Sequence, residues 1–236
     1  MKMWKRAILG ALALVIGMGL GGWTAYEQQH YFEDAANTTR QMLYYRDKQL
    51  AGSGSAVVIA EGRMVSAAHL FEPGLNPDGW RVATDHGKAN VEIEFIDYDT
   101  DVAILKANVH CPCAELSRGQ PGLYEEVFFA GYPLGIPHPV VTTGRYQGRD
   151  DIWHSLATAQ IAPGNSGGGA FMVQHGRVVL YGITNYQKAF FEQLQFERLM
   201  VGVPHLAGTL DTEFIKKAIA CADGSDADWC SMGMGD

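Results

Sequence analysis

The sequence predicts an all-β fold, built as a sandwich or as barrels, and two observations support this. Short apolar runs follow one another from residue 56 onward, separated by turns that draw on the 28 Gly and 9 Pro of the chain. Between these runs there is no segment with helical periodicity until residue 211, which argues against a parallel α/β sheet. The predicted strands are Ala56–Ala60, Met64–Ala68, Trp80–Thr84, Val91–Ile96, Val102–Leu105, Glu126–Ala130, Val140–Gly144, Gly169–Val173, Val178–Ile183 and Leu199–Val203.

The length and the charge limit what the chain can be. Its 236 residues suit one large domain or two small ones, and 47% hydrophobic with 19% charged residues is typical of a globular protein. The net charge is -8 and the isoelectric point is near 5.4. Because phosphate backbones are bound by clustered Lys and Arg, which the sequence lacks, no nucleic-acid partner is expected.

The N-terminus carries an export or anchor signal. Lys2, Lys5 and Arg6 precede an uncharged apolar stretch, Ala7–Ala25, which is long enough to span a bilayer as a helix. Trp23 interrupts the small-residue pattern of a cleavage site, so we expect an uncleaved anchor, with a cleaved signal peptide as the alternative. The basic start predicts a cytoplasmic N-terminus and a periplasmic or otherwise extracytoplasmic remainder.

Two further segments read as helices. Residues 27–50 hold no Pro and no Gly and carry apolar residues at partly helical spacing, which predicts a helical stalk that could self-associate. Near the other end, Asp211–Ala222 has the pattern of a short helix whose start Thr212 and nearby acids can cap.

A glycine-rich segment surrounds a candidate nucleophile, Ser166. In Pro163-Gly164-Asn165-Ser166-Gly167-Gly168-Gly169 the glycines allow a turn in which the N–H groups of Gly164 and Ser166 converge on one point. Such a point is an oxyanion hole for the tetrahedral intermediate of acyl transfer. The plain alternative is a glycine-rich turn without catalytic function.

Two other residues complete a possible catalytic set. His69 ends an apolar strand, and the ordinary pKa of histidine suits it to accept the serine proton. Asp101 begins the buried run Val102–Leu105, where a carboxylate needs a partner, although a strand-capping Asp would look the same. Asp97 and Asp99 resemble turn residues.

Together these motifs resemble the trypsin-like serine peptidases, and in detail their HtrA (Deg) branch, from about Gly52 to Gly208. The resemblance implies a chymotrypsin-like fold of two six-stranded antiparallel β-barrels with the triad in the cleft between them. His69 and Asp101 would lie on the first barrel and Ser166 on the second. The expected organisation is a start and anchor at 1–26, a stalk at 27–50, a protease domain at 51–210 with barrels near 51–110 and 122–208, and a helix and tail at 211–236.

The same resemblance assigns the substrate wall and the mode of regulation. Substrate-binding residues are expected at Gln160, Gly182, Ile183, Thr184 and Asn185. No acid lies among them, so we expect an uncharged P1 residue of modest size. Trypsin-like zymogens use an Asp just before the nucleophile as a charge switch, and this chain has Asn165 there. Residues 209–236 are too few for a PDZ domain after the protease.

The four cysteines fit one or two disulfides if the domain is exported. Zinc is disfavoured because structural sites usually space cysteines as C-x2-4-C, and no metal or cofactor is expected. The resemblance places Cys111 and Cys113 where the linker between the barrels begins and Cys221 in the C-terminal helix. We therefore expect one bridge from Cys111 or Cys113 to Cys221, and a second from the remaining cysteine to Cys230.

The function expected is a serine endopeptidase that acts on protein or peptide substrates, in processing or quality control at a membrane. An α/β-hydrolase is excluded because that fold places its acid and histidine after the serine. A protease-like binding or structural module without activity stays as the alternative.

Overall fold

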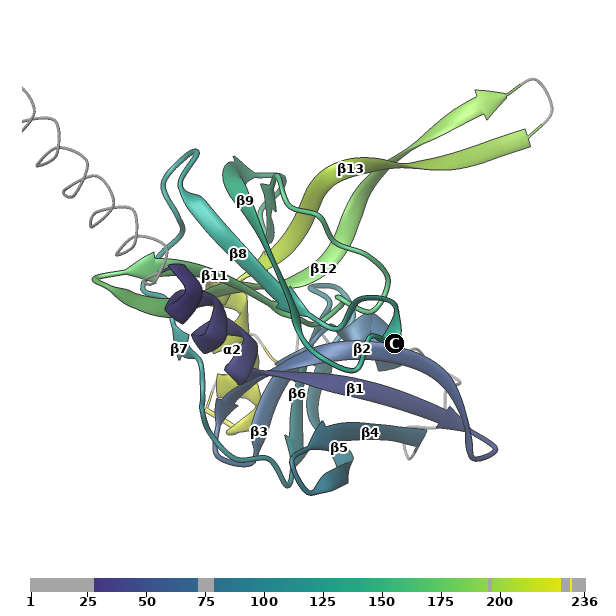
Figure 1. The fold of residues 1–236 in the computed structure, drawn as a ribbon, viewed down its shortest axis with the longest axis vertical. Helices are drawn as coiled ribbons and strands as arrows, with labels where there is room; N and C mark the ends of the chain where they lie inside the picture. Colours follow the sequence, from purple (N-terminus) through teal and green to yellow (C-terminus); the bar gives the residue numbers. More distant parts are fainter. Residues whose placement is uncertain (1–27, 72–78, 195–196, 226–229, 231–236) are drawn as a thin grey trace, which may run out of the picture.

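The first of two β-barrels forms from the N-terminal half. A computed structural model of the chain describes residues 28–71, 79–194, 197–225 and 230, with the backbone alone for 186–206. Six antiparallel strands close in the order β1-β2-β3-β6-β5-β4, the last joint being between β4 and β1 (Figure 1). The strands are β1 (Thr39–Arg46), β2 (Gln49–Ala60), β3 (Arg63–Ser66), β4 (Trp80–Thr84), β5 (Gly87–Asp97) and β6 (Val102–Ala107).

The second barrel follows a linker. Its six antiparallel strands close because β11 pairs with both β8 and β12, and the short strand β7 (Glu115–Leu116) adds to β12 in parallel. In Figure 1, β12 and β13 also continue beyond the barrel as a two-stranded ribbon that projects from the body. The strands are β8 (Glu126–Gly131), β9 (Val140–Arg149), β10 (His154–Ala157), β11 (Gly169–Gln174), β12 (Arg177–Leu194) and β13 (Glu197–Asp211). The two-barrel fold expected from the sequence is thus confirmed.

Strands at the seam between the barrels are buried on both faces, which explains their continuous apolar runs. Along β6, Ala103 and Leu105 belong to the core of the first barrel, whereas Val102 and Ile104 belong to a core shared by both barrels. On the other side β8 alternates in the same way between that shared core and the core of the second barrel. Because successive side chains of a strand point to opposite faces, each seam strand needs apolar residues at every position.

The predicted helical stalk at 27–50 is wrong for most of its length. Helix is present only at residues 28–38, and the chain then forms β1 and the start of β2. The hydroxyls of Thr38 and Thr39 both donate to the Ala35 carbonyl at 3.0 Å, so side chains take up an oxygen near the end of this helix. The next residues pair with β2 and β4 and close the barrel.

Helices are few in this fold. The C-terminal helix α2 (Thr212–Ala222) is present as predicted, although Asp211 at its N-cap makes no side-chain capping hydrogen bond. Among the described residues two short 3₁₀ turns, η1 (Ala68–Phe71) and η3 (Pro133–Gly135), lie near the seam. Within the described residues no helix is both long and apolar enough for a membrane span. The predicted anchor at Ala7–Ala25 lies outside those residues.

The disulfide pairing predicted across the linker and the C-terminal helix is wrong. The bridges are Cys111–Cys113, with Cα atoms 4.5 Å apart, and Cys221–Cys230, with Cα atoms 5.5 Å apart. Helix α2 does meet the linker, but at Ser117 and through its first two turns. Thr212 Oγ1 lies 3.1 Å from Ser117 Oγ, and Lys216 Nζ donates to the Ser117 carbonyl at 2.6 Å. Cys221 is at the opposite end of the helix, so the two cysteines of the linker form a bridge with each other.

A buried carboxylate lies where β13 passes into α2. The Asp211 side chain has no exposed surface, and the Ser155 hydroxyl donates a short hydrogen bond to its Oδ1. Arg149 Nη2 lies 3.1 Å from Oδ2, without the geometry of a hydrogen bond, and its own side chain is half exposed. Burial raises the pKa of Asp211, and the Ser155 hydrogen bond and Arg149 only partly oppose this. Folding therefore shifts the equilibrium of this side chain toward the protonated acid relative to the unfolded chain.

We predict that this carboxylate makes the protein less stable as pH rises. A pKa raised by folding gives stability that is complete below the unfolded value of about 3.9 and is lost as pH passes the folded value. In denaturant unfolding from pH 4 to pH 7, the free energy of unfolding of the native chain should fall relative to that of Asp211→Asn. Asp47→Asn, at an exposed position of the β1–β2 turn, is the control and should run parallel to the native chain. A constant difference between Asp211→Asn and the native chain would contradict the prediction.

Candidate active site

His69 is placed by the end of the third strand. After β3 ends at Ser66, the small and fully buried Ala67 and Ala68 carry the chain under the seam, and His69 lies in the η1 turn. Its side chain is 39% exposed, so one edge of the ring faces the protein and the other faces solvent. The apolar strand thus delivers a titratable ring to the surface at a fixed point.

Asp101 faces His69 from the turn before β6. Asp97, the last residue of β5, organises that turn by accepting the Asp99 N–H at 3.0 Å and the Thr100 hydroxyl at 2.6 Å. The prediction of a turn residue is confirmed for Asp99, whereas Asp97 ends the strand. Asp101 itself has φ of 58°, a left-handed conformation that Asp tolerates better than most residues. One carboxylate oxygen accepts the His69 N–H at 2.7 Å, and the other lies 2.8 Å from His69 Nδ1.

This double contact fixes the histidine. A carboxylate accepts hydrogen bonds and cannot donate one, so His69 Nδ1 carries a proton and Nε2 of the neutral ring is the basic nitrogen. The backbone contact prevents His69 from moving away from Asp101 along η1. The pair has the arrangement expected of a general base and its orienting acid.

Asn185 holds Asp101 from the second barrel. Its Nδ2 donates to the Asp101 carboxylate at 2.9 Å and to the Asp101 carbonyl at 3.1 Å. The sequence placed this residue in the wall for substrate, whereas the structure puts its side chain behind the histidine and aspartate, 5% exposed. The signal in the sequence was a polar residue at the end of an apolar strand.

Ser55 holds the nucleophile segment from the first barrel. Its N–H donates to the Ser166 carbonyl at 2.8 Å, and its hydroxyl donates to the Gly164 carbonyl at 2.7 Å and accepts the Tyr132 N–H at 2.9 Å. Ser55 is fully buried in β2, and sequence reasoning missed it. A serine directly before the apolar run of β2 was the only sign.

Two peptide planes of the nucleophile segment are fixed through their carbonyls. The Leu134 N–H of η3 donates to the Pro163 carbonyl at 2.7 Å, and the Gly168 N–H donates to the Asn165 carbonyl at 2.8 Å. In a trans peptide the N–H points opposite to the C=O, so these bonds set the directions of the Gly164 and Ser166 N–H groups. Neither N–H has a backbone acceptor within the described residues.

Glycines are required where this segment passes the first barrel. Gly167 has φ of 78°, and a Cβ added there would lie 2.2 Å from Ser66 Oγ and 2.3 Å from the Ser55 carbonyl oxygen. Gly164 has φ of 100°, and its Cβ would lie 2.5 Å from the Tyr132 carbonyl oxygen. Gly167 therefore lies directly against strands β2 and β3, where Ser66 stands three residues before His69 in the chain, and Gly164 lies against the segment that follows β8.

Ser166, directly before Gly167 in this segment, is half-buried. The structure brings His69 and Asp101 into contact, and it brings Ser166 to the same seam through Ser55. Across the described residues no hydrogen bond joins the Ser166 hydroxyl to His69.

The other residues predicted to bind substrate are placed as follows. Gln160 is exposed before the nucleophile, and its carbonyl accepts the Thr142 hydroxyl at 2.9 Å. The Ile183 side chain is in the shared core, and the Thr184 backbone bonds Gly167 and Gly168 at 2.7 Å each. Any contribution of Ile183 to binding would come from its backbone. Within the described residues no three His, Cys, Asp or Glu side chains gather as a possible metal site.

Comparisons with known proteins agree with this architecture. Protease Do-like 2, chloroplastic, of Arabidopsis thaliana is 29% identical over 140 residues, which make up 54% of this chain and 23% of that protein. The match thus spans less than a quarter of the relative. Two solved structures share the fold: the serine endoprotease of Yersinia pestis, with a TM-score of 0.65 and 20% identity over 82% of this chain and 65% of that chain, and an inactive mutant of Rv3671c from M. tuberculosis, with a TM-score of 0.63 and 16% identity over 83% and 91%.

The family itself is shown by the sequence. The model of the trypsin-like peptidase domain matches residues 54–179, more than half of the chain. That range includes Ser55 on β2, the His69 and Asp101 pair and the whole nucleophile segment. The chain belongs to the trypsin-like peptidase domain family.

Proposed function

We propose that the chain is a serine endopeptidase that hydrolyses peptide bonds with His69, Asp101 and Ser166 as its triad. The observation that carries the proposal is the double contact of Asp101 with His69, next to a glycine-rich segment whose two inner N–H groups are aimed by fixed peptide planes. Membership of the family and the name of the Arabidopsis relative favour proteolysis in the same way.

The reaction proposed follows from these geometries. His69 Nε2 accepts the Ser166 hydroxyl proton while the serine oxygen attacks the scissile carbonyl, and Asp101 stabilises the imidazolium that forms. The N–H groups of Gly164 and Ser166 then bind the oxyanion of the tetrahedral intermediate. Collapse breaks the C–N bond, His69 gives its proton to the leaving amine, and water repeats the sequence on the acyl-enzyme.

In this proposal Asn185 keeps Asp101 in the position that the triad needs. An amide nitrogen donates and does not accept, so Asn185 Nδ2 holds the carboxylate of Asp101 in place beside His69. The His69 N–H and Asn185 Nδ2 each occupy a lone pair of the Asp101 carboxylate, so the carboxylate meets the imidazole N–H in one orientation.

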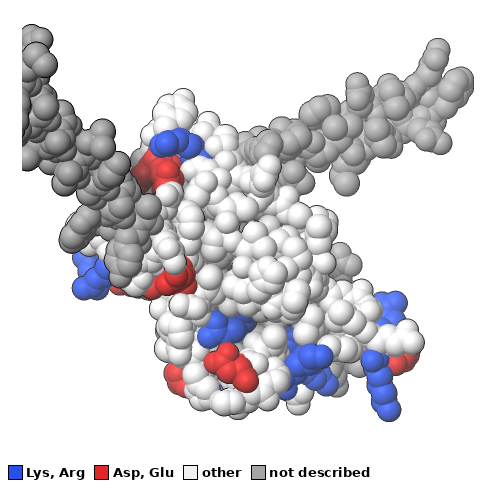
Figure 2. Space-filling model, viewed as in Figure 1, with Lys and Arg blue, Asp and Glu red and all other residues white. Residues whose placement is uncertain are grey.

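The substrates and the location proposed are those of a tethered protease. The apolar stretch Ala7–Ala25 after a basic start supports anchorage with the protease domain outside the cytoplasm, and both disulfides suit an oxidising compartment. Figure 2 shows a face on which charges of both signs are dispersed around an uncharged middle. Such a surface suits protein substrates in processing or quality control at a membrane.

One observation favours a second candidate, an inactive protease-like binding module: no hydrogen bond joins Ser166 to His69 within the described residues. Catalytic hydrogen bonds are often long in structures without substrate and tighten only when it binds, so the two candidates differ in reactivity and not in the resting contact.

We predict that a fluorophosphonate probe labels Ser166. Attack on phosphorus needs the same base and the same oxyanion donors as attack on a carbonyl, so labelling reports an assembled site. Peptide mass spectrometry of the labelled chain locates the adduct. Ser166→Ala should lose both labelling and peptide hydrolysis while its circular dichroism stays native, and Ser225→Ala, on the exposed C-terminal turn, is the control. A native-like Ser166→Ala that still hydrolyses peptides would disprove the triad, and an unlabelled Ser166 would support the inactive module.

We predict that Asp101→Asn lowers kcat by about ten-thousandfold, because an amide at this position stabilises the wrong tautomer of His69. Part of the deficit should return at alkaline pH, where a stronger external base replaces the histidine. The measurement is kcat against pH on a peptide substrate, with Asp99→Asn, in the exposed turn before it, as the control. An Asp101→Asn enzyme within tenfold of the native rate would contradict the assignment.

We predict a smaller effect for the residue behind the aspartate. Asn185→Ala should lower kcat by about ten- to a hundredfold, the loss of one hydrogen bond to a charged group, and leave KM nearly unchanged. Asn185→Ser keeps a donor and should recover part of the rate, whereas Asn90→Ala, exposed on β5, should have no effect. A rise in KM at constant kcat would instead support the wall for substrate predicted from the sequence.

A further inference from the structure

The Cys111–Cys113 bridge does little to hold the fold. In the chain-entropy account a disulfide stabilises a protein by restricting the unfolded chain, and the effect grows with the loop it closes. This bridge spans a sequence separation of 2, against 9 for Cys221–Cys230. It ties together only the linker residues on either side of Pro112, and no strand or helix of the barrels.

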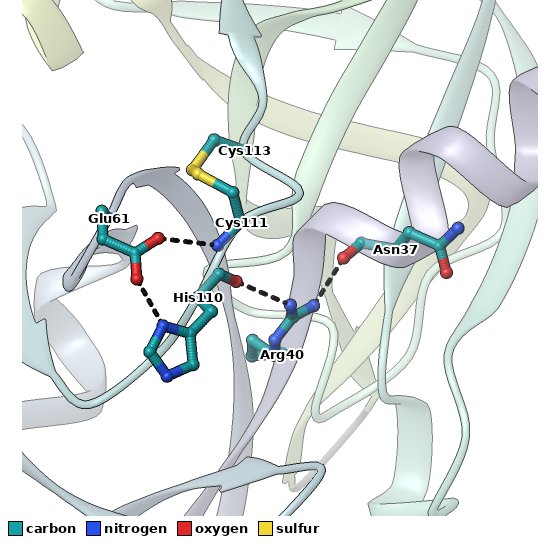
Figure 3. Close-up of a disulfide and its surroundings, with 6 residues drawn as sticks. All are labelled: Asn37, Arg40, Glu61, His110, Cys111 and Cys113. Carbon is teal, nitrogen blue, oxygen red and sulfur yellow. Dashed lines mark hydrogen bonds and ion pairs between the residues drawn. A yellow bond between two sulfur atoms is a disulfide. The ribbon is translucent and has the colours of Figure 1, made fainter.

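The linker is anchored on the N-terminal side of the bridge by side chains. Figure 3 shows the Glu61 carboxylate, from the β2–β3 turn, holding His110 Nδ1 in a short contact and accepting the Cys111 N–H at 3.1 Å. Arg40 donates to the His110 carbonyl at 3.3 Å and to the Asn37 carbonyl at 2.6 Å. The hydrogen bonds from His110 and the Cys111 N–H lower the pKa of Glu61, which keeps it a carboxylate acceptor.

A second anchor lies on the C-terminal side. The Ala114 N–H donates to the Val58 carbonyl of β2 at 2.8 Å, and Cys113 packs against the core of the first barrel. The bridge is therefore a small loop between two attachments that do not depend on the sulfur–sulfur bond. When the bond opens, both attachments remain, and the two thiols stay close enough to form it again.

Accessibility distinguishes the two bridges. Cys111 is exposed and Cys113 is half-buried, whereas Cys221 and Cys230 are both half-buried. A thiolate must reach a disulfide sulfur to attack it, so Cys111, the one exposed residue among these four cysteines, is the expected point of attack.

We propose that Cys111–Cys113 is a thiol–disulfide exchange site that takes dithiols as its substrate while the protein stays folded. One thiolate of the dithiol attacks Cys111 Sγ, and the bond to Cys113 breaks. The electron pair goes to Cys113 Sγ, which takes a proton from water. The second thiol of the dithiol then displaces Cys111, so that the dithiol is oxidised to a disulfide and the two cysteines are reduced. The exchange is independent of peptide hydrolysis and adds a two-electron function to the linker between the barrels.

The experiment compares the two bridges in one molecule. The full oxidised chain carrying Ser166→Ala, which prevents self-digestion, is mixed with dithiothreitol, quenched with acid at intervals, alkylated and mapped by mass spectrometry. Cys111 and Cys113 should become alkylated at least about tenfold faster than Cys221 and Cys230, because only the first pair includes an exposed cysteine. Near-UV circular dichroism should stay native throughout. Equal rates for the two pairs, or opening of Cys111–Cys113 only as the near-UV signal is lost, would overturn the proposal.

Closure of the bridge tests the anchors. When oxidised dithiothreitol is added to the reduced chain, Glu61→Gln should re-form Cys111–Cys113 several-fold more slowly than the parent, because Cys111 is held less closely to Cys113. Glu61 and Glu92 line the same surface pocket. Glu92→Gln therefore removes a negative charge from the same region without touching the linker, and it should close the bridge at the parent rate. If Glu61→Gln closes as fast as the parent, the anchors do not preorganise the site, and the exchange function as proposed fails.

Discussion

The site depends on one exchange of hydrogen bonds across the seam between the barrels. Ser55, on the first barrel, binds the carbonyls of Gly164 and Ser166 on the second. Asn185, on the second barrel, binds the carboxylate and the carbonyl of Asp101 on the first. Each barrel thus fixes the backbone that carries the chemistry of the other. All of these donors are buried or nearly so, where an unpaired partner would be costly, so the contacts are specified strictly.

The shared hydrophobic core allows such contacts to be accurate. Residues of β2, β3 and β6 pack against residues of β8, β11, β12 and α2 in one cluster, and close packing leaves the barrels little freedom to shift. The polar contacts lie at the edge of this cluster. The apolar seam holds the two barrels rigidly together, and the hydrogen bonds from Ser55, Asn185 and Leu134 orient the groups of the site.

The sequence allowed the residues with a recognisable local pattern to be predicted, but not those whose role depends on contacts with the opposite barrel. His69 and Asp101 could be singled out because His69 follows an apolar strand and Asp101 directly precedes one, and the two barrels followed from the resemblance. Ser55 and the role of Asn185 could not, because their partners are 109 and 84 residues away in the chain and nothing local indicates which strand passes them. The segment from Thr39 onward was mistaken for helix because barrel closure with β2 and β4 decides its conformation, and local propensity does not. The disulfide pairing failed for a related reason, since the end of α2 that approaches the linker carries Lys216 and not Cys221.

The hydrogen bonds that Ser55 and Asn185 each make to the opposite barrel also have a consequence for how the molecule folds. Neither barrel contains a complete set of supports, so a nascent chain whose first barrel has folded still lacks the residue that holds Asp101, and the nucleophile segment has no place to dock until both halves exist. The site would become reactive only in the last step of folding, when the two barrels dock. For the endopeptidase proposed above, this order of assembly would be a safeguard, because an incompletely folded copy could not cleave neighbouring proteins.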